Sequence, residues 1–174
     1  MAVTAASFIN KFATTQNEFD TARLTDYIAR YETITLIELF GKELYDLYVA
    51  GIAGADPIYE FLRDAFTVQL DNGVLLDSRG VDDIILGVVY FYYHRDNYTQ
   101  QTINGGVKNT GENSENVTVF VSNIQARWDE AIGSYHSIQL YLLENDGVYP
   151  TFLGLKKSKV NLIMMLQWFA RNLM

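Results

Sequence analysis

The densest run of hydrophobic positions lies within Val81–Tyr98. Two acids open this stretch, ten residues without a charge follow, and His94 and Arg95 close it. Acids at the front and bases at the back suit the dipole of a helix, and a run that is apolar on all sides indicates a buried helix. A strand is the alternative, because Val, Tyr and Phe favour sheets, but the length favours a helix. The run is too short for a bilayer, which needs roughly 20 apolar residues.

A helical period also marks the chain before this stretch. It predicts a helix that Asp20 or Thr21 caps, that Gly41 breaks or bends, and that ends at Gly51. The face that it defines consists of Leu24, Tyr27, Ile28, Tyr31, Ile34 and Ile37.

The next helix should begin at Pro57, with Asp56 as its cap. We expect it to run over residues 58–70, up to a turn at residues 71–73, from which a short connection leads into the central helix.

Residues 99–116 are polar and rich in Gly, Asn and Gln, so they predict a long projecting loop or hairpin. Thr102-Ile103 and Val117–Val119 flank it and are expected to pair as a short ribbon.

A second long helix is predicted after this loop, with Ser122 as its N-cap and residues 145–147 as its end. Its stripe should pack on the central helix, giving two long antiparallel helices joined by the polar loop. The stripe consists of Val121, Ile124, Trp128, Ala131 or Ile132, Tyr135, Ile138 and Leu142.

These elements predict a mainly α protein, a small helical bundle with extended terminal arms. An N-terminal arm, residues 1–17, is expected to dock through Phe8, Ile9 and Phe12, with a neighbouring copy as one option. The bundle should cover residues 18–147, with its loop at 99–117.

A C-terminal tail, residues 148–174, completes this division. As a helix capped by Ser158 the tail would show one apolar face, and as a strand it would run over residues 160–166. The helical face would contain Leu162, Met165, Leu166 and Phe169.

The charge of −8 is unevenly spread. From residue 155 onward there are four bases and no acids, so the first 154 residues carry nine bases against 21 acids, a net −12. An acidic body disfavours a grip on nucleic acid phosphates. There are no cysteines, which removes disulfides and thiol chemistry, and the first residues show no secretion leader, so we expect cytoplasmic synthesis.

Motifs of catalysis are absent from the sequence, and we expect no enzyme, cofactor or metal site. Neighbouring acids such as Asp82 and Asp83 diverge by about 100 degrees on a helix, so they do not face one ligand. His94 is either a ligand or proton donor in a helical pocket, together with the tyrosines around it, or a partly buried core histidine. The core interpretation is favoured, and His136 should lie on the surface. Gly87 costs about 1 kcal/mol relative to Ala, which indicates close approach of another helix.

Several roles remain open for the basic, apolar tail. It is the last element of the core, a segment that docks on a partner protein, or a membrane-surface helix. The last is disfavoured because the bases precede the apolar part. For docking on a partner protein or on a neighbouring copy, the candidate residues are Lys156, Lys157, Lys159, Leu162, Met165, Trp168, Phe169 and Arg171.

Four segments together resemble a known family, the small helical head–tail connector (neck adaptor) proteins of tailed bacteriophages. The segments read YETITLIELFGKELYDL, VVYFYYHRDNYTQ, TINGGVKNTGENS and NIQARWDEAIGSYHSIQLYL. They lie between Leu24 and Glu144, whereas the first 17 residues and the tail match nothing in the family's pattern.

The resemblance implies a helical bundle with a long loop between two long helices. It implies a virion neck protein, a homo-oligomeric ring of about twelve copies that bridges the portal protein and the tail or stopper protein. DNA passes through such a ring without sequence-specific binding, and no membrane is involved. The loop residues that would touch a neighbouring copy are Asn104, Gly105, Gly106, Val107, Lys108 and Asn109.

Overall fold

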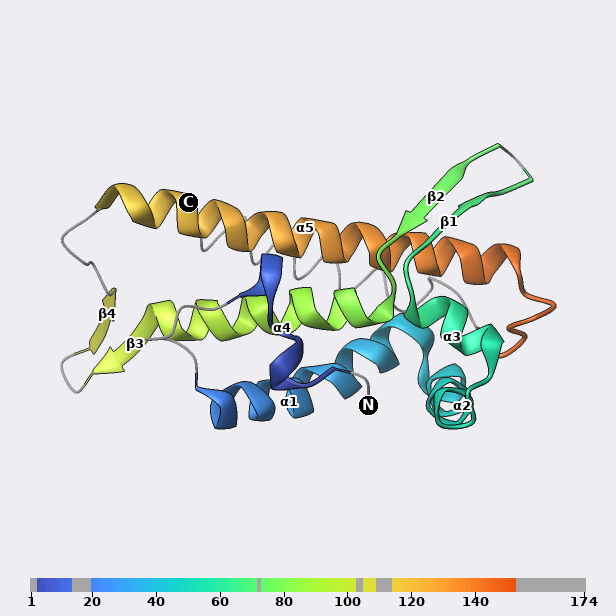
Figure 1. Cartoon of the computed structure of the whole chain (residues 1–174), viewed down its shortest axis with the longest axis horizontal. Coiled ribbons are helices and arrows are strands. Elements are labelled where there is room, and N and C mark those ends of the chain that lie inside the picture. The colour runs from blue at the N-terminus through green and yellow to red at the C-terminus, as the bar shows by residue number, and fades with distance from the viewer. Residues whose placement is uncertain (1–2, 14–19, 72, 103–104, 109–113, 153–174) are drawn as a thin grey trace.

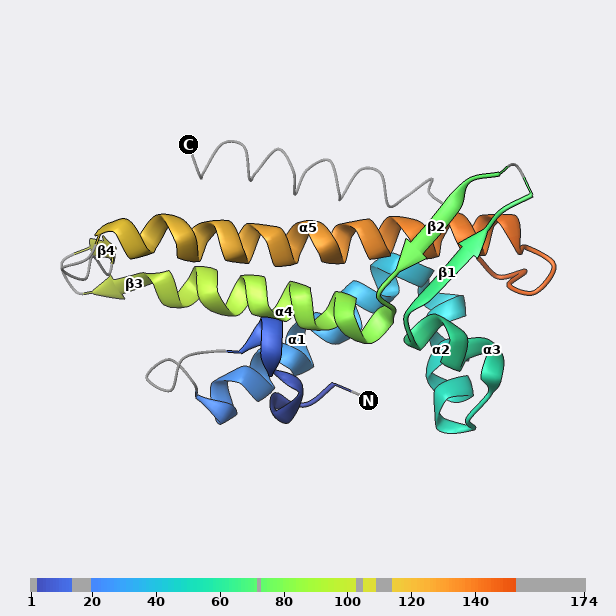
Figure 2. The ribbon, with the colours of Figure 1, turned by 45° about the horizontal axis from the view of Figure 1, so that its top comes forward.

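The computed structural model of the chain is mainly helical, as the sequence predicts. It describes residues 3–13, 20–71, 73–102, 105–108 and 114–152. Of these, residues 98–102, 105–108 and 114–121 are described by their backbone only. Two helices dominate it, α4 over Val81–Tyr98 and α5 over Ser114–Glu144. They lie side by side and run in opposite directions, with α1 along another side of α4 (Figures 1 and 2).

The helices before α4 begin and end at strong local signals. The Asp20 side chain caps α1, Thr21–Phe40, by accepting a hydrogen bond from the Arg23 backbone N–H at 3.1 Å. Gly41, with φ of +78°, separates α1 from α2, Lys42–Ala53, because glycine adopts this backbone conformation without strain. Both features were predicted. The predicted end of α2 at Gly51 is wrong, since the helix continues for two more residues.

A short helix, α3, covers Pro57–Arg63, with Asp56 as its cap and Pro57 in its first turn, as predicted. The predicted continuation to residue 70 is wrong. The chain turns instead into β1, Phe66–Gln69, which pairs antiparallel with β2, Leu75–Ser78.

Tertiary contact explains this change from helix to strand. The Phe66 ring stacks on Phe61 at 4.8 Å and lies 5.3 Å from the ring of Tyr141 on α5, so the strand buries an aromatic group that a longer helix would carry elsewhere. The predicted turn then closes the hairpin, with the Leu70 N–H donating to the Val74 carbonyl at 2.8 Å.

The polar segment after α4 forms a hairpin between β3, Thr99–Thr102, and β4, Gly105–Lys108. The predicted pairing of Thr102 with Val117–Val119 is wrong, because residues 117–119 belong to α5. Pairing within a short hairpin closes a smaller loop and so costs less entropy.

The second long helix begins at Ser114 and not at the predicted Ser122. Once packing has nucleated a helix, each preceding residue adds one hydrogen bond, and the weak helix propensity of β-branched residues does not stop it. Its end, directly before Asn145, is as predicted.

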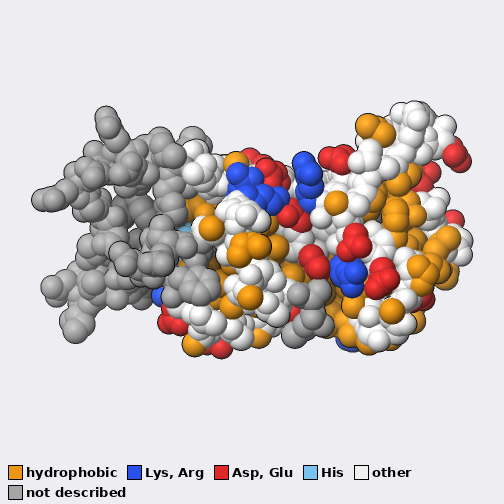
Figure 3. Space-filling view, viewed as in Figure 1, with side chains coloured by type: hydrophobic (Ala, Val, Ile, Leu, Met, Phe, Trp, Pro, Cys, Tyr) orange, Lys and Arg blue, Asp and Glu red, His pale blue; other side chains and the backbone are white. Residues whose placement is uncertain are grey.

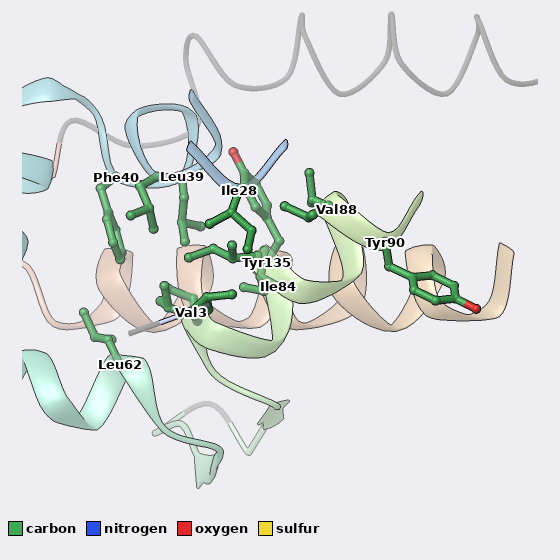
Figure 4. Packing of buried hydrophobic residues seen from close by; sticks show 14 of the residues in the cluster. Val3, Ile28, Leu39, Phe40, Leu62, Ile84, Val88, Tyr90 and Tyr135 are labelled. Atoms are coloured by element: carbon green, nitrogen blue, oxygen red, sulfur yellow. The ribbon is translucent and has the colours of Figure 1, made fainter. Parts of the chain in front are cut away.

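One core lies between α1, α4 and α5. Figure 4 shows Ile28 and Leu39 of α1, Ile84 of α4 and Tyr135 of α5 gathered there, with Val3 from the N-terminal segment. The predicted stripe of α5 faces this core, since six of its positions are buried: Ile124, Trp128, Ala131, Tyr135, Ile138 and Leu142.

The N-terminal segment packs on the same chain. Two short 3-10 helices, η1 over Ala5–Ser7 and η2 over Asn10–Phe12, lie against α1 and α4. Phe8 and Phe12 are buried in this core, whereas Ile9 is exposed. The expected arm therefore covers its own bundle over residues 3–13.

Candidate functional site

The candidate residues of the C-terminal tail, from Lys156 to Arg171, lie outside the described residues. Their predicted role in binding a portal protein or a neighbouring copy therefore stays a prediction. Of the loop candidates, Asn104 and Asn109 also lie outside them, and Gly105–Lys108 form the backbone of β4. Figure 1 places this strand at the end of the α4–α5 pair that is remote from the β1–β2 hairpin.

His94 is a core residue. Its side chain is only 2% exposed, and its ring lies 4.2 Å from that of Tyr90 and 5.6 Å from that of Tyr93. The favoured core interpretation is confirmed, although the ring is fully and not partly buried. His136, in contrast, is exposed on α5, as predicted.

The tyrosines around His94 also belong to the packing of the fold. Tyr90 and Tyr93 are buried, and Tyr92 stacks on Tyr31 of α1 with ring centroids 4.1 Å apart. The Tyr93 hydroxyl accepts a hydrogen bond from the backbone N–H of Asp20 at 3.1 Å, which ties the start of α1 to α4. Of this predicted cluster, only the side chain of Tyr98 lies outside the described ones.

The neighbouring acids at the start of α4 diverge, as the helical geometry predicts. Asp83 forms an ion pair with Lys11 at 2.8 Å, and the same ammonium group reaches Glu130 of α5 at 2.9 Å. Burial raises the pKa of Asp82, against the attraction of the nearby Arg63 guanidinium. The two carboxylates thus serve different contacts, and Lys11 links the N-terminal segment to α4 and α5.

Glu130 is stabilised in its charged form. Partial burial opposes ionisation, but hydrogen bonds from Lys11 and Arg127 outweigh it and lower the pKa of this carboxyl. This cluster links three segments of the chain, and its acids and bases are all engaged with one another.

Sequence reasoning missed one buried charge, Glu32. Its side chain is 5% exposed, and its Oε2 atom has no hydrogen-bond partner among the described residues. Burial raises the pKa of Glu32, and repulsion from Asp82 adds to this effect.

The spacing of the buried residues on α1 contains the signal that was missed. Leu24, Ile28, Glu32 and Leu36 lie four residues apart and are all buried. The predicted face followed Ile34 instead, which is 49% exposed. A buried stripe is recognised from the spacing of apolar residues. Because the charged Glu32 lies within this one, the apolar pattern did not reveal it.

Apolar side chains are exposed mainly at the end of the molecule that carries α2, α3 and the β1–β2 hairpin. Figure 3 shows hydrophobic side chains gathered over this end on the face in view. The exposed apolar residues of these elements and of the turn between the strands are Leu47, Val49, Ile58, Val74 and Leu75. Sequence reasoning missed this patch, because its members come from segments with different periods.

The two helices of the central pair approach closely at Gly87, as predicted. A Cβ atom at this position would lie 2.7 Å from the Ala131 Cβ and 3.1 Å from the Arg127 carbonyl oxygen. The described residues contain no group of three or more His, Cys, Asp or Glu that could hold a metal ion. Not one of the described helices combines the length and the hydropathy needed to cross a bilayer.

The described part of the chain therefore exposes apolar side chains at one end, and the charged groups around Lys11 hold three of its segments together. No protein-family model matches the chain, and comparisons with curated proteins and with solved structures give no match.

Proposed function

We propose that this protein is a structural subunit of a virion, a head–tail connector whose copies form a ring of about twelve in the neck. The ring joins a portal protein to a tail or stopper protein and is assembled from chains made in the host cytoplasm. It lines the channel through which DNA passes, without catalysis, cofactor or membrane. Its subunit is a small bundle built on two long antiparallel helices.

One observation carries the proposal: the molecule has two different surfaces at opposite ends of an elongated body. The polar β3–β4 hairpin lies at one end of the α4–α5 pair (Figure 1). The exposed apolar patch lies at the other end, which carries α2, α3 and the β1–β2 hairpin (Figure 3). A ring that closes by head-to-tail contact needs two unlike, complementary patches on each subunit.

Two further features support this function. The first 154 residues carry a net charge of −12, so a channel lined by them would repel phosphates and let DNA slide. The resemblance to connector proteins includes the polar segment that forms β3 and β4, in which we propose that residues 104–109 contact the neighbouring copy. The basic tail is the proposed contact with the portal.

The test is the mass of the purified protein, alone and mixed with a candidate portal protein, by light scattering or native mass spectrometry. We expect a ring-sized or portal-bound species. Alanine replacement of residues 104–109, or Leu75→Asp in the apolar patch, should shift this species to monomers. Asn123→Ala, at an exposed position of α5, is the control and should leave the assembly intact. A monomer under all conditions would contradict the proposal.

The alternative, a small helical enzyme or ligand-binding protein that uses His94 and its tyrosines, stays a prediction. No observation favours it, because the His94 side chain is almost completely enclosed. Under this alternative, His94→Gln would abolish activity; under the connector proposal it leaves assembly unchanged.

A further inference from the structure

A second apolar surface lies on α5, on the side that faces away from the core. From Ala131 to Leu143 the helix carries no charged residue. Three exposed positions at helical spacing, His136, Leu140 and Leu143, form what we call the outer face of α5. Leu140 and Leu143 are 41% and 39% exposed, and partial burial lowers the pKa of His136, which favours the uncharged ring.

We propose that the C-terminal tail of the same molecule, residues 153–174, covers this outer face. The proposal does not depend on the connector function, since it concerns the isolated chain. A tail that also binds a portal would have to leave the face, so portal binding and this contact would compete.

The place where the described chain ends supports this occupant. After α5 the chain turns back, and the Tyr149 ring lies 6.2 Å from the ring of Tyr141. Phe152, the last described residue, packs against the core. The tail therefore starts beside the last turns of α5. The seven residues 153–159 can span up to about 25 Å, which is enough to turn back onto the helix.

The lengths also agree. The uncharged part of α5, from Ala131 to Leu143, is about 18 Å long at 1.5 Å per residue. Residues 160–174, in the helical form that the sequence allows, would be about 22 Å long. The apolar face predicted for them has the spacing of a helix that packs on another helix, with Leu162, Met165, Leu166 and Phe169 on one side.

Charge favours an antiparallel arrangement. The C-terminal end of α5 is the negative end of its dipole and carries Glu144, with Asp146 close behind. In an antiparallel arrangement Lys156, Lys157 and Lys159 would lie near this end of α5. Arg171 lies 14 residues beyond Lys157, about 21 Å along a helix. Asp129, which is exposed, lies 15 residues before Glu144, about 22 Å along α5. In this arrangement the lysines at one end of the tail and Arg171 at the other would each lie near an acid.

The absence of cysteine from the chain allows a direct test in the full-length protein. A single thiol at position 140, from Leu140→Cys, reports on the outer face. Ile34→Cys on α1, where the native side chain is 49% exposed, is the matched control. We expect alkylation of the thiol at 140 to be about tenfold slower than at 34, because the tail must open first.

Charged substitutions in the tail should remove this protection. With Met165→Glu and Phe169→Glu added, alkylation at 140 should rise to the rate of the control, and alkylation at 34 should not change. Equal rates at both positions with the native tail would overturn the proposal. Slow alkylation at position 140 that the tail substitutions do not change would also overturn the proposal, because a segment other than the tail would then cover the outer face.

A crosslink tests the same contact without charged substitutions, and so remains informative if those variants precipitate. The proposed alignment sets Leu162 beside Leu140. Oxidation of a chain with Leu140→Cys and Leu162→Cys should therefore give a disulfide at monomer mass. A disulfide found only at dimer mass would show that a second copy supplies the tail, and no disulfide would show that the tail lies elsewhere; both results overturn the proposal.

Discussion

Helix α4 has two flanks that are stabilised in different ways. Toward α5 the contact depends on small size, since Gly87 leaves room for Ala131 and for the Arg127 carbonyl. Toward α1 it depends on rings with polar ends. The Tyr27 hydroxyl donates to Asp96 at 2.8 Å, and the ring of Tyr31 stacks on that of Tyr92.

The two flanks should respond differently to added side-chain volume and to protonation. A backbone in close contact has no side chain that can move aside, so any added atom must shift a helix. The flank toward α1 also contains the buried carboxyl of Glu32, so its stability depends on pH. The α5 flank should therefore be sensitive to volume, and the α1 flank to protonation.

The largest effect is expected from Gly87→Ala. A methyl group there collides with Ala131, so the free energy of unfolding should fall by about 1–3 kcal/mol. Gly133→Ala, in the same pair of helices but with open space around the added atom, is the control and should raise it by up to about 1 kcal/mol. Urea denaturation measures both. A change of the same sign in both variants would contradict the close approach at Gly87.

A smaller effect, of opposite sign, is expected from Glu32→Gln. The pKa of Glu32 is raised in the folded state, so below the pKa of the unfolded chain the carboxyl is protonated in both states and its burial is tolerated. As the pH rises through the raised pKa, the folded protein loses stability, because the carboxyl ionises more easily in the unfolded chain. The variant should therefore be more stable than the native protein at pH 7 by about 1 kcal/mol, and nearly equal to it at about pH 4.

Urea midpoints at the two pH values check this dependence. Asp26→Asn, at an exposed position of the same helix, is the control and should change stability by less than about 0.5 kcal/mol. An advantage of the Gln variant that is greater at acid pH would show that the sign is wrong.

The smallest effect is expected from Tyr27→Phe, which removes the hydrogen bond to Asp96 and keeps the ring. Because the contact is only partly buried, the loss should be about 0.5 kcal/mol. Thermal unfolding measures it against Tyr45→Phe on α2, a half-buried ring away from this contact, for which we expect no change. A loss as large as that of Gly87→Ala would mean that the two flanks do not differ in the way described.

Local signals in the sequence were enough for much of the fold. The bounds of α4 follow from an uncharged run between acids and bases, and the caps at Asp20 and Asp56 follow from side chains that bond the first turn of a helix. The break at Gly41 and the buried stripe of α5 were also predicted, because each depends only on residues within a few turns.

The predicted secondary structure was wrong where contacts with residues far apart in the sequence determine it. Phe66 lies in a strand because Phe61 and Tyr141 surround its ring. Val117–Val119 lie in a helix because α5 extends back past them from its packed part. The candidate surfaces divide in the same way: the polar hairpin was visible as composition, whereas the apolar patch joins three elements and appeared only in three dimensions.

The sequence by itself determined that this protein is mainly helical, where its central helix lies, and which residues of α5 face the core. Hydrogen bonding within a helix and the burial of an apolar stripe are local properties, so the order of residues is sufficient for them. Only the tertiary structure decided that Glu32 is buried, that His94 is enclosed by its tyrosines, and that the chain leaves α3 for a hairpin. Those outcomes depend on which side chains meet across the fold, and that is set by packing among segments far apart in the chain.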